Sequence, residues 1–252
     1  VWCSDNSDAI SRLRIQHGTS LVYPPCTMGA HVSEVPNHQI GRVTPLSTRG
    51  HVALAGQFGL EMDITRSAPE VVSALAGLVA LAKQTRGLLR HGDHYRLVSP
   101  FDGNRAAWML VSRDRDEALV VFVLGLVEPN RVLPRLKLRG LDPGARYRCE
   151  PGPAGEWPGD QLMTLGLPVT LKQDFTSLAW HLRKGEQRSA AYLAKNPQGL
   201  VPALELWDGT VLTQSLAIIE YLDEVHPEPP LLPPGPADRA RARAIACAVA
   251  CE

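Results

Sequence analysis

The chain has 252 residues, of which 44% are hydrophobic and 21% are charged, so it can form one large core or two small ones. Lys and Arg number 26, as do Asp and Glu, and no block of like charge occurs, which argues against a nucleic-acid partner. The longest apolar runs fall well short of the roughly 20 residues that cross a membrane, so we expect no membrane partner and a cytoplasmic protein.

From residue 1 to about 64, apolar residues alternate between helical and strand-like spacing, as in βα units. Ile10, Leu13 and His17 share one face of a predicted helix, and the segment "LVYPPC" after it has the pattern of a strand. The sequence opens at Val1 in the middle of a motif, so we expect an upstream part. This region is interpreted as the C-terminal part of an α/β barrel.

A helical pattern follows, with Pro69 in its first turn and Gly87 near its end. We take residues 1–91 as the barrel part with this connecting helix. Short strands then alternate with the turn signals "DGN", "DPG" and "PGPAG", which is typical of an antiparallel β-sandwich, predicted over 92–183. The strands are "HYRLVS", "AAWMLVSR", "EALVVFVLGLV", "RLKLRG", "ARYRCE" and "DFTSLAWHL".

A third pattern begins at Lys184. It contains a short helix, the strands "VPALEL" and "TVLTQ", the helix "SLAIIEYLDEVH", the proline-rich linker "PEPPLLPPGP" and an Ala/Arg-rich helix at the end. We predict a partial α/β domain over 184–230, then a linker and a truncated helix over 231–252.

The segment "WCSDNSD" carries two carboxylates, Asp5 and Asp8, at a strand-to-helix junction, where barrel enzymes place reacting groups. Asp8 is better explained as a helix N-cap, a role open to Ser7 as well, because it directly precedes the helical pattern. Asp5 lies too early to cap the helix, so it is the better catalytic candidate.

The stretch from "WCSDNSDAISRLRIQHGTSLVYPPCTMGAHVSEVPNHQ" to "GQFGLEMDIT" resembles the end of the catalytic barrel of family 36 retaining α-galactosidases. The region up to about residue 183, with "GDQLMTLGLPV" and "DFTSLAWHL", resembles the β-sandwich of that family. The resemblance implies a small-molecule α-galactoside substrate, no cofactor and no metal, with Asp5 as the general acid/base. It also implies a nucleophilic Asp in a Lys-Trp-Asp-like motif, which this sequence does not contain.

A closed barrel needs on the order of 200 residues or more, whereas only about sixty have barrel texture here. The strands of residues 1–64 would then have unpaired edges. We therefore expect this region to be loosely folded or prone to aggregation when it is expressed alone.

The stretch "KGEQRSAAYLAKNPQGLVPALELWDGTVLTQSLAIIEYLDEVHPEPPLLP" resembles the thioredoxin-like domain of zeta-class glutathione transferases, the maleylacetoacetate isomerases. The resemblance implies glutathione as cofactor, a cis bond before the proline of "GLVPAL" and Ser215 as the cap of a helix whose N–H groups bind a carboxylate. The implied glutathione contacts are Gln187, Val201, Pro202, Gln214 and Ser215. An ordinary capped amphipathic helix is the alternative for "QSLAIIEYL". The family's SSCS-like motif is missing before Lys184.

Three hypotheses follow from these resemblances. The chain is an α-galactosidase portion, a glutathione-binding module of the isomerase type, or a join of two genes at "HLRK" that has no activity of its own. We favour the third for the join itself and the first for the function. Both families form oligomers, so an oligomer is compatible with either resemblance.

The sequence also contains alternatives for a metal site, which we disfavour. His31 and His38 have no acidic or cysteine companion at ligand spacing. Cys247 and Cys251 share a helical face but fit small packing residues better. The cysteines, which lack a CxxC pair, are typical of reduced thiols; the others are Cys3, Cys26 and Cys149.

Overall fold

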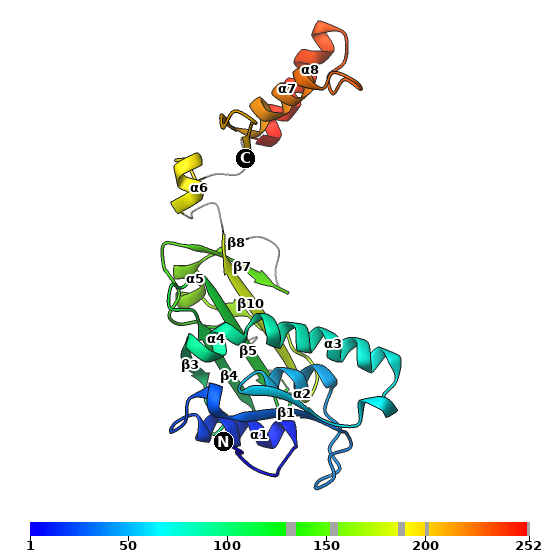
Figure 1. Cartoon of the computed structure of the whole chain (residues 1–252), viewed down its shortest axis with the longest axis vertical. Coiled ribbons are helices and arrows are strands. Elements are labelled where there is room, and N and C mark those ends of the chain that lie inside the picture. Colours follow the sequence, from blue (N-terminus) through cyan, green and yellow to red (C-terminus); the bar gives the residue numbers. More distant parts are fainter. Residues whose placement is uncertain (130–134, 152–155, 186–189, 200–201, 251–252) are drawn as a thin grey trace. The chain divides into compact units, whose positions relative to one another are not determined.

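The computed structural model describes residues 1–129, 135–151, 156–185, 190–199 and 202–250. The chain divides into two compact units, Val1–Lys184 and Gly185–Glu252, and Figure 1 labels their helices and strands. The first unit contains both the barrel part and the strand-rich region, and the second contains the rest.

The first unit begins with alternating helices and strands. Strands β1 and β2 are parallel, in register from Gly29 opposite Gln57 to Ser33 opposite Glu61, and α2 connects them. Within the described residues no third strand joins this pair. The arrangement is that of successive units of an α/β barrel. The elements are α1 (Ala9–Thr19), the 3-10 helix η1 (Pro25–Thr27), β1 (Gly29–Ser33), α2 (Leu46–Ala53), β2 (Gln57–Glu61) and the 3-10 helix η2 (Ile64–Arg66).

The segment "LVYPPC" is not a strand, and this prediction was wrong. Ser20 ends α1 by bonding back to it, its N–H to the carbonyl of Gln16 and its Oγ to that of His17. Two consecutive prolines follow and open η1, because proline fixes φ and lacks the N–H that a strand ladder needs. Leu21, Val22 and Tyr23 are exposed as a result.

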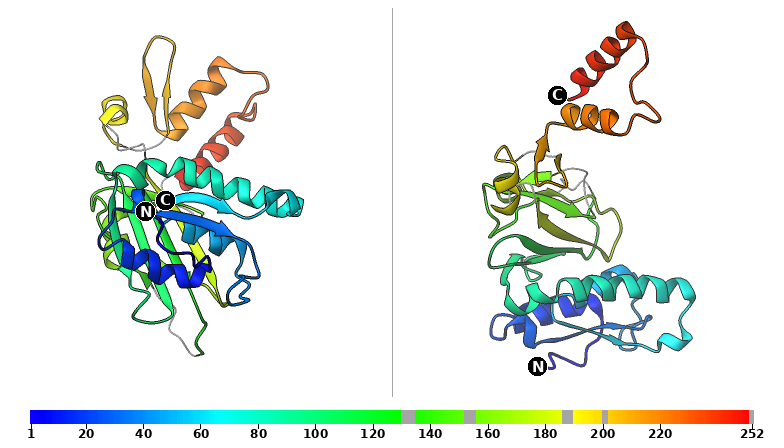
Figure 2. Two further views of the ribbon diagram at one scale, coloured as in Figure 1. Left: turned by 60° about the horizontal axis from the view of Figure 1, so that its bottom comes forward. Right: turned by 45° about the horizontal axis from the view of Figure 1, so that its top comes forward.

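The connecting helix is divided in two, into α3 (Pro69–Gln84) and α4 (Arg86–His91). Pro69 stands at the start of α3, as predicted, whereas Gly87 lies just beyond the end of α3, as the second residue of α4. The break is at Thr85, whose Oγ1 donates to the carbonyl of Leu81. Figure 2 shows that the N-terminal end of α3 projects beyond the strands of the sheet.

One antiparallel sheet of six strands, in the order β3-β4-β5-β10-β7-β8, forms the centre of the first unit. Both faces of its middle strands are buried: Met109, Val120 and Leu182 belong to one core cluster, and Trp108 and Val121 to the other. This is why the strand sequences read as continuous apolar runs. The strands are β3 (Asp93–Val98), β4 (Arg105–Val111), β5 (Glu117–Leu124), β7 (Arg146–Glu150), β8 (Glu156–Pro158) and β10 (Thr176–Lys184).

The layers on the two faces of this sheet differ. On one face the described residues add only the ladder of β6 (Arg135–Leu136) with β9 (Leu167–Pro168) and the helix α5 (Gly159–Thr164). Helices α1, α2 and α4 of the barrel part cover the other face. The barrel part thus covers one of the two faces of the sheet.

The second unit follows the predicted order of helices and strands. Its hairpin pairs β11 with β12 in antiparallel register. Among its described residues, Ile218 is the one apolar side chain that is buried. None of the helices in the described part of the chain has the length and apolar composition that crossing a membrane requires. The elements are α6 (Ala190–Lys195), β11 (Ala203–Glu205), β12 (Val211–Thr213), α7 (Ser215–Val225) and α8 (Pro236–Ala250).

Candidate active site

Asp5 lies in the loop between the N-terminal segment and α1. The N-terminal segment runs beside β1, since the N–H of Gly29 donates to the carbonyl of Val1 at 2.9 Å. The Asp5 carboxylate is exposed, and its Oδ1 accepts a hydrogen bond from the indole Nε1 of Trp2 at 2.8 Å. An exposed carboxylate with one oxygen fixed by a donor is available for proton transfer through its other oxygen.

Asp8 has the structural role predicted for it. It is the N-cap of α1, and its Oδ2 accepts from the N–H and the Oγ of Ser11, each at 2.8 Å. The same oxygen accepts from Nη1 of Arg42, and the residue is only 3% exposed. Ser7, the alternative cap, instead accepts a hydrogen bond from the side chain of Asn37. Asp8 is therefore committed to capping α1 and to Arg42, whereas the Asp5 carboxylate is exposed.

The loop that carries Asp5 is held by Arg12, which was not among the predicted site residues. Arg12 on α1 donates from Nη1 to the carbonyls of Ser4 and Asn6, the two neighbours of Asp5 in the sequence. The loop also bonds to itself, from the N–H of Asn6 to Oγ of Ser4 at 3.1 Å. Burial lowers the pKa of the Arg12 guanidinium, and the charges of Cys3 and Glu61 oppose this effect.

The residue spacing of α1 indicates that Arg12 is buried. The buried residues of α1 are Ala9, Arg12, Leu13 and Gln16, which have the spacing of a single helical stripe. The predicted apolar face took Ile10 and His17 instead, and both are only half-buried. Polar residues at two positions of the buried stripe would have indicated a buried polar network.

His31 lies close to the candidate site without forming a metal centre. Its ring packs on Trp2, with the ring centroids 4.8 Å apart, and burial lowers its pKa. Its Nδ1 is buried and has no hydrogen-bond partner among the residues that the structure describes. Among the described residues, no group of three His, Cys, Asp or Glu side chains is arranged to hold a metal ion.

The predicted glutathione contacts are only partly described. Gln187 and Val201 lie outside the described residues, as does the Val201–Pro202 bond. Pro202 is exposed just before β11, and Gln214 donates from Nε2 to Oε1 of Gln198 at 3.0 Å. The described residues alone therefore do not form the predicted glutathione site.

The prediction that Ser215 caps α7 was wrong. Gln214 occupies the cap position with φ of 73°, and Ser215 is already the first helical residue. No side chain makes a capping hydrogen bond at this helix start. A hydroxyl inside the first turn is not in the cap position from which it would accept the free helix N–H groups.

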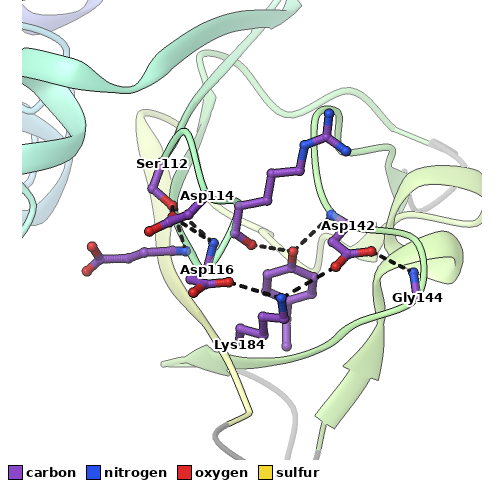
Figure 3. Close-up of polar contacts among 9 residues, drawn as sticks. Ser112, Asp114, Asp116, Asp142, Gly144 and Lys184 are labelled. Carbon is purple, nitrogen blue, oxygen red and sulfur yellow. Dashed lines mark hydrogen bonds and ion pairs between the residues drawn. The ribbon is translucent and has the colours of Figure 1, made fainter. Parts of the chain in front are cut away.

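A polar cluster closes the C-terminal end of the first unit, as Figure 3 shows. Nζ of Lys184 lies 3.0 Å from Oδ1 of Asp116 and 3.4 Å from Oδ2 of Asp142. The hydrogen bond from Lys184 to Asp116 is the main reason that the Lys184 pKa is raised. The N–H of Lys184 also donates to the carbonyl of Asp116 at 2.7 Å, so the last strand is fixed by both main chain and side chain.

Comparison with known proteins identifies the first unit. A family model described as Melibiase matches residues 1–92, and one described as the glycosyl hydrolase family 36 C-terminal domain matches residues 105–182. An α-galactosidase of Geobacillus stearothermophilus, AgaA, is 51% identical over 188 residues, which cover 74% of this chain. In its first unit the chain belongs to glycoside hydrolase family 36. The match covers 26% of AgaA, so the chain spans about a quarter of the length of that curated relative.

Further relatives and solved structures agree with this assignment. A probable α-galactosidase G of Aspergillus terreus is 40% identical over 185 residues, or 73% of this chain and 25% of the relative. The crystal structure of the family 36 α-galactosidase AgaB of G. stearothermophilus gives a TM-score of 0.70 at 50% identity, covering 73% of this chain and 25% of that one. A variant of AgaA in complex with raffinose gives 0.69 at 50% identity, with 72% and 25% covered.

A third family model, described as the glutathione S-transferase N-terminal domain, matches residues 162–225. It overlaps the family 36 match over residues 162–182. Most of β10 lies in the overlap and is paired with β5 and β7 of the six-stranded sheet, so these residues belong to the first unit. The transferase-like part of the match therefore concerns the second unit alone.

Proposed function

We propose that the first unit acts as part of an α-galactosidase, with Asp5 as the general acid/base. The proposal rests on the Asp5 carboxylate, which is exposed and held by Trp2 while Asp8 is committed to capping. Family 36 membership supports the reaction class. The substrate is a small α-galactoside, and the raffinose bound by the AgaA variant is of this kind.

In the proposed reaction Asp5 acts twice. Oδ1 accepts from the Trp2 indole, so the proton of the neutral acid resides on Oδ2 and passes to the leaving glycosidic oxygen. Asp5, now a carboxylate, then removes a proton from the attacking water. A second carboxylate about 5 Å away is needed as nucleophile in a retaining enzyme. The present sequence has no Lys-Trp-Asp motif to supply it, so we infer that this group comes from a part of the barrel outside these residues.

The proposal is tested by transplanting residues 1–184 into AgaA in place of the quarter that they match, and by measuring hydrolysis of raffinose. We expect turnover in the chimera and a loss of about 10²-fold to 10⁴-fold in kcat for Asp5→Asn. Asp102→Asn, which changes another exposed carboxylate, serves as the control and should retain parental turnover. Equal turnover in Asp5→Asn and the parent chimera would rule out Asp5 as the acid/base.

A second readout identifies the step that Asp5 serves. With p-nitrophenyl α-galactoside the leaving group needs little protonation, so an Asp5→Ala chimera should stall at the glycosyl-enzyme stage. Azide needs no general base and should restore turnover by attacking the anomeric carbon and displacing the enzyme carboxylate. An α-galactosyl azide product supports the assignment, whereas β-galactosyl azide contradicts it.

For the second unit we propose glutathione binding, supported by the family match over residues 162–225 and by the predicted element order. The unit is then a partial thioredoxin-like domain. Isothermal titration of the full chain with reduced glutathione tests this, with Ser215→Ala and Gln214→Ala as variants and Lys195→Ala as the control. Heat of binding that both variants abolish is the expected result. Absence of binding at millimolar glutathione contradicts the proposal.

We also propose that the two units were joined at "HLRK" from separate genes, since the unit boundary follows Lys184 and the family 36 match ends at residue 182. Long reads of unamplified source DNA across codons 170 to 200 decide this. Reads that cross the join and continue upstream of Val1 establish a fusion, and reads that diverge at the join show two separate proteins. We further propose that the protein is cytoplasmic and that it forms an oligomer, since both families that it resembles form oligomers.

A further inference from the structure

Arg12 is buried beneath the loop that carries Asp5, and each of its three side-chain nitrogens donates to an oxygen acceptor. Nη1 lies 3.3 Å from the carbonyl oxygen of Ser4 and 3.1 Å from that of Asn6. Nη2 donates to the carbonyl of Gly29 on β1 at 2.9 Å. The side chain is 3% exposed. One guanidinium therefore joins both sides of the Asp5 residue to the strand beside it.

Gln16, one turn further along α1, fixes the orientation of the guanidinium. Its Oε1 accepts from Nε of Arg12 at 3.1 Å, and its Nε2 donates to the carbonyl of Val52 on α2 at 2.9 Å. Gln16 is as deeply buried as Arg12. The loop of Asp5 is thus connected through two buried side chains to a second helix of the barrel part.

The acceptors of Arg12 are neutral, which makes its burial informative. A buried cation costs free energy unless its donors are satisfied, and in these contacts the acceptors are three peptide carbonyls and one side-chain amide. A lysine ammonium has three donors around one atom and cannot span this set, whereas the planar guanidinium can. The arrangement fixes peptide orientations with the accuracy that a proton-transfer group needs.

We propose that Arg12 is the positioning residue for Asp5, acting through the peptide groups on either side of it. The inference rests on the proposed role of Asp5 as acid/base. Arg12 does not touch substrate in this role. It sets the direction of the Asp5 side chain and thereby the geometry of the hydrogen bond from Trp2.

The indole N–H of Trp2 reports this geometry without any need for activity. In the full chain labelled with ¹⁵N-tryptophan, the Trp2 resonance is assigned from Trp2→Phe, and Asp5→Asn shows its position when the carboxylate is lost. We expect Arg12→Lys to move the Trp2 resonance toward that of Asp5→Asn. The indoles of Trp108 and Trp180, which lie in the sheet, should stay in place. Arg14→Lys is the matched control, since Arg14 lies on the same helix, is exposed and donates to the carbonyl of Pro100, away from the Asp5 loop.

Unchanged Trp2 resonance in Arg12→Lys would overturn the inference, as would an equal shift in Arg14→Lys. Arg12→Ala removes all four hydrogen bonds of the guanidinium and should move the Trp2 resonance at least as far as Arg12→Lys does. Movement of all indole resonances together would show a general loss of structure and would also overturn it, because Arg12 would then stabilise the fold as a whole.

The chimera with AgaA supplies the kinetic arm. Arg12→Lys should lower kcat by about tenfold to a hundredfold with KM within about twofold, since misplacement of a catalytic group affects the transition state. A KM effect alone contradicts the positioning role. Loss of the Trp2 signature together with full turnover in Asp5→Asn would instead contradict the proposed function, so the two failures are distinguishable.

Discussion

The two units contain helices and strands with similar apolar patterns, but their apolar side chains are buried to very different extents. In the first unit the middle strands of the sheet are covered on both faces, and residues such as Leu119 and Leu182 are at most 1% exposed. In the described part of the second unit, Ile219, Leu222 and Ile245 are exposed, and Trp207 is fully so. A helix of suitable pattern does not make a core by itself, because burial requires a second layer.

The largest expected effect comes from truncating a buried residue of the first unit, compared with an exposed apolar residue of the second. Leu182→Ala removes a fully buried side chain from β10 and should lower the free energy of unfolding of the first unit by about 2–5 kcal/mol. Leu222→Ala changes a side chain that is 37% exposed and should leave that free energy within about 0.5 kcal/mol.

Urea unfolding in a Trp207→Phe background measures this difference, because every remaining tryptophan belongs to the first unit. A loss in Leu222→Ala comparable to that in Leu182→Ala would mean that the two units fold as one. Equal midpoints for the parent and Leu182→Ala would contradict the packing of β10.

Acid should destabilise the first unit through His51, which joins α2 to the sheet. Its Nδ1 lies 2.8 Å from Oγ of Ser177, and burial lowers its pKa from 6.5 to about 4. Between these two values the unfolded chain binds more protons than the folded one, so stability falls as the pH falls. The expected loss from this residue is on the order of 2 kcal/mol between pH 6.5 and 4.

His51→Gln tests this prediction because it removes the titrating group and keeps hydrogen-bonding atoms. Its free energy of unfolding should decline less steeply than that of the parent over the same pH range. His94, with a pKa also lowered to about 4 by burial, contributes with the same sign, so part of the slope should remain. Parallel profiles for the parent and His51→Gln would contradict the assignment.

The strands of the sheet could be predicted from sequence because their apolar runs and turn residues are local signals. The layers that cover the sheet could not be predicted. A strand buried on both faces has the same apolar pattern whether a second sheet or, as for Val121, helices of the barrel part pack against it. The strand predicted at "LVYPPC" failed for a related reason. Its apolar residues match a strand in type, but the capping bonds of Ser20 and the following prolines decide its conformation.

At the candidate site, the sequence separated Asp5 from Asp8 by position alone, and the cap formed by Asp8 confirms that half of the prediction. The contacts that Trp2 and Arg12 make could not be predicted, because they are set by tertiary structure, although the stripe Ala9, Arg12, Leu13 and Gln16 indicates that Arg12 is buried. At α7 the prediction of Ser215 as the cap followed the resemblance and the preference of Ser for cap positions, whereas the helix begins one residue earlier than expected and Gln214, with a φ of 73°, is the cap residue.

The smallest expected effect concerns the boundary between the units. Lys184→Met removes the ion pairs with Asp116 and Asp142, which are partly exposed, and should lower the free energy of unfolding of the first unit by about 0.5–1 kcal/mol. Because the Lys184 pKa is raised, this contribution is present at neutral pH and is lost as the pH rises through the raised value. High salt should reduce it.

Lys195→Met, which breaks the pair with Glu205 inside the second unit, is the matched control and should leave the first unit unchanged. An equal loss in both variants would show that the boundary at Lys184 does not separate two independent units. The contrast between the buried core of the first unit and the exposed apolar side chains of the second would then not describe two separately folded parts.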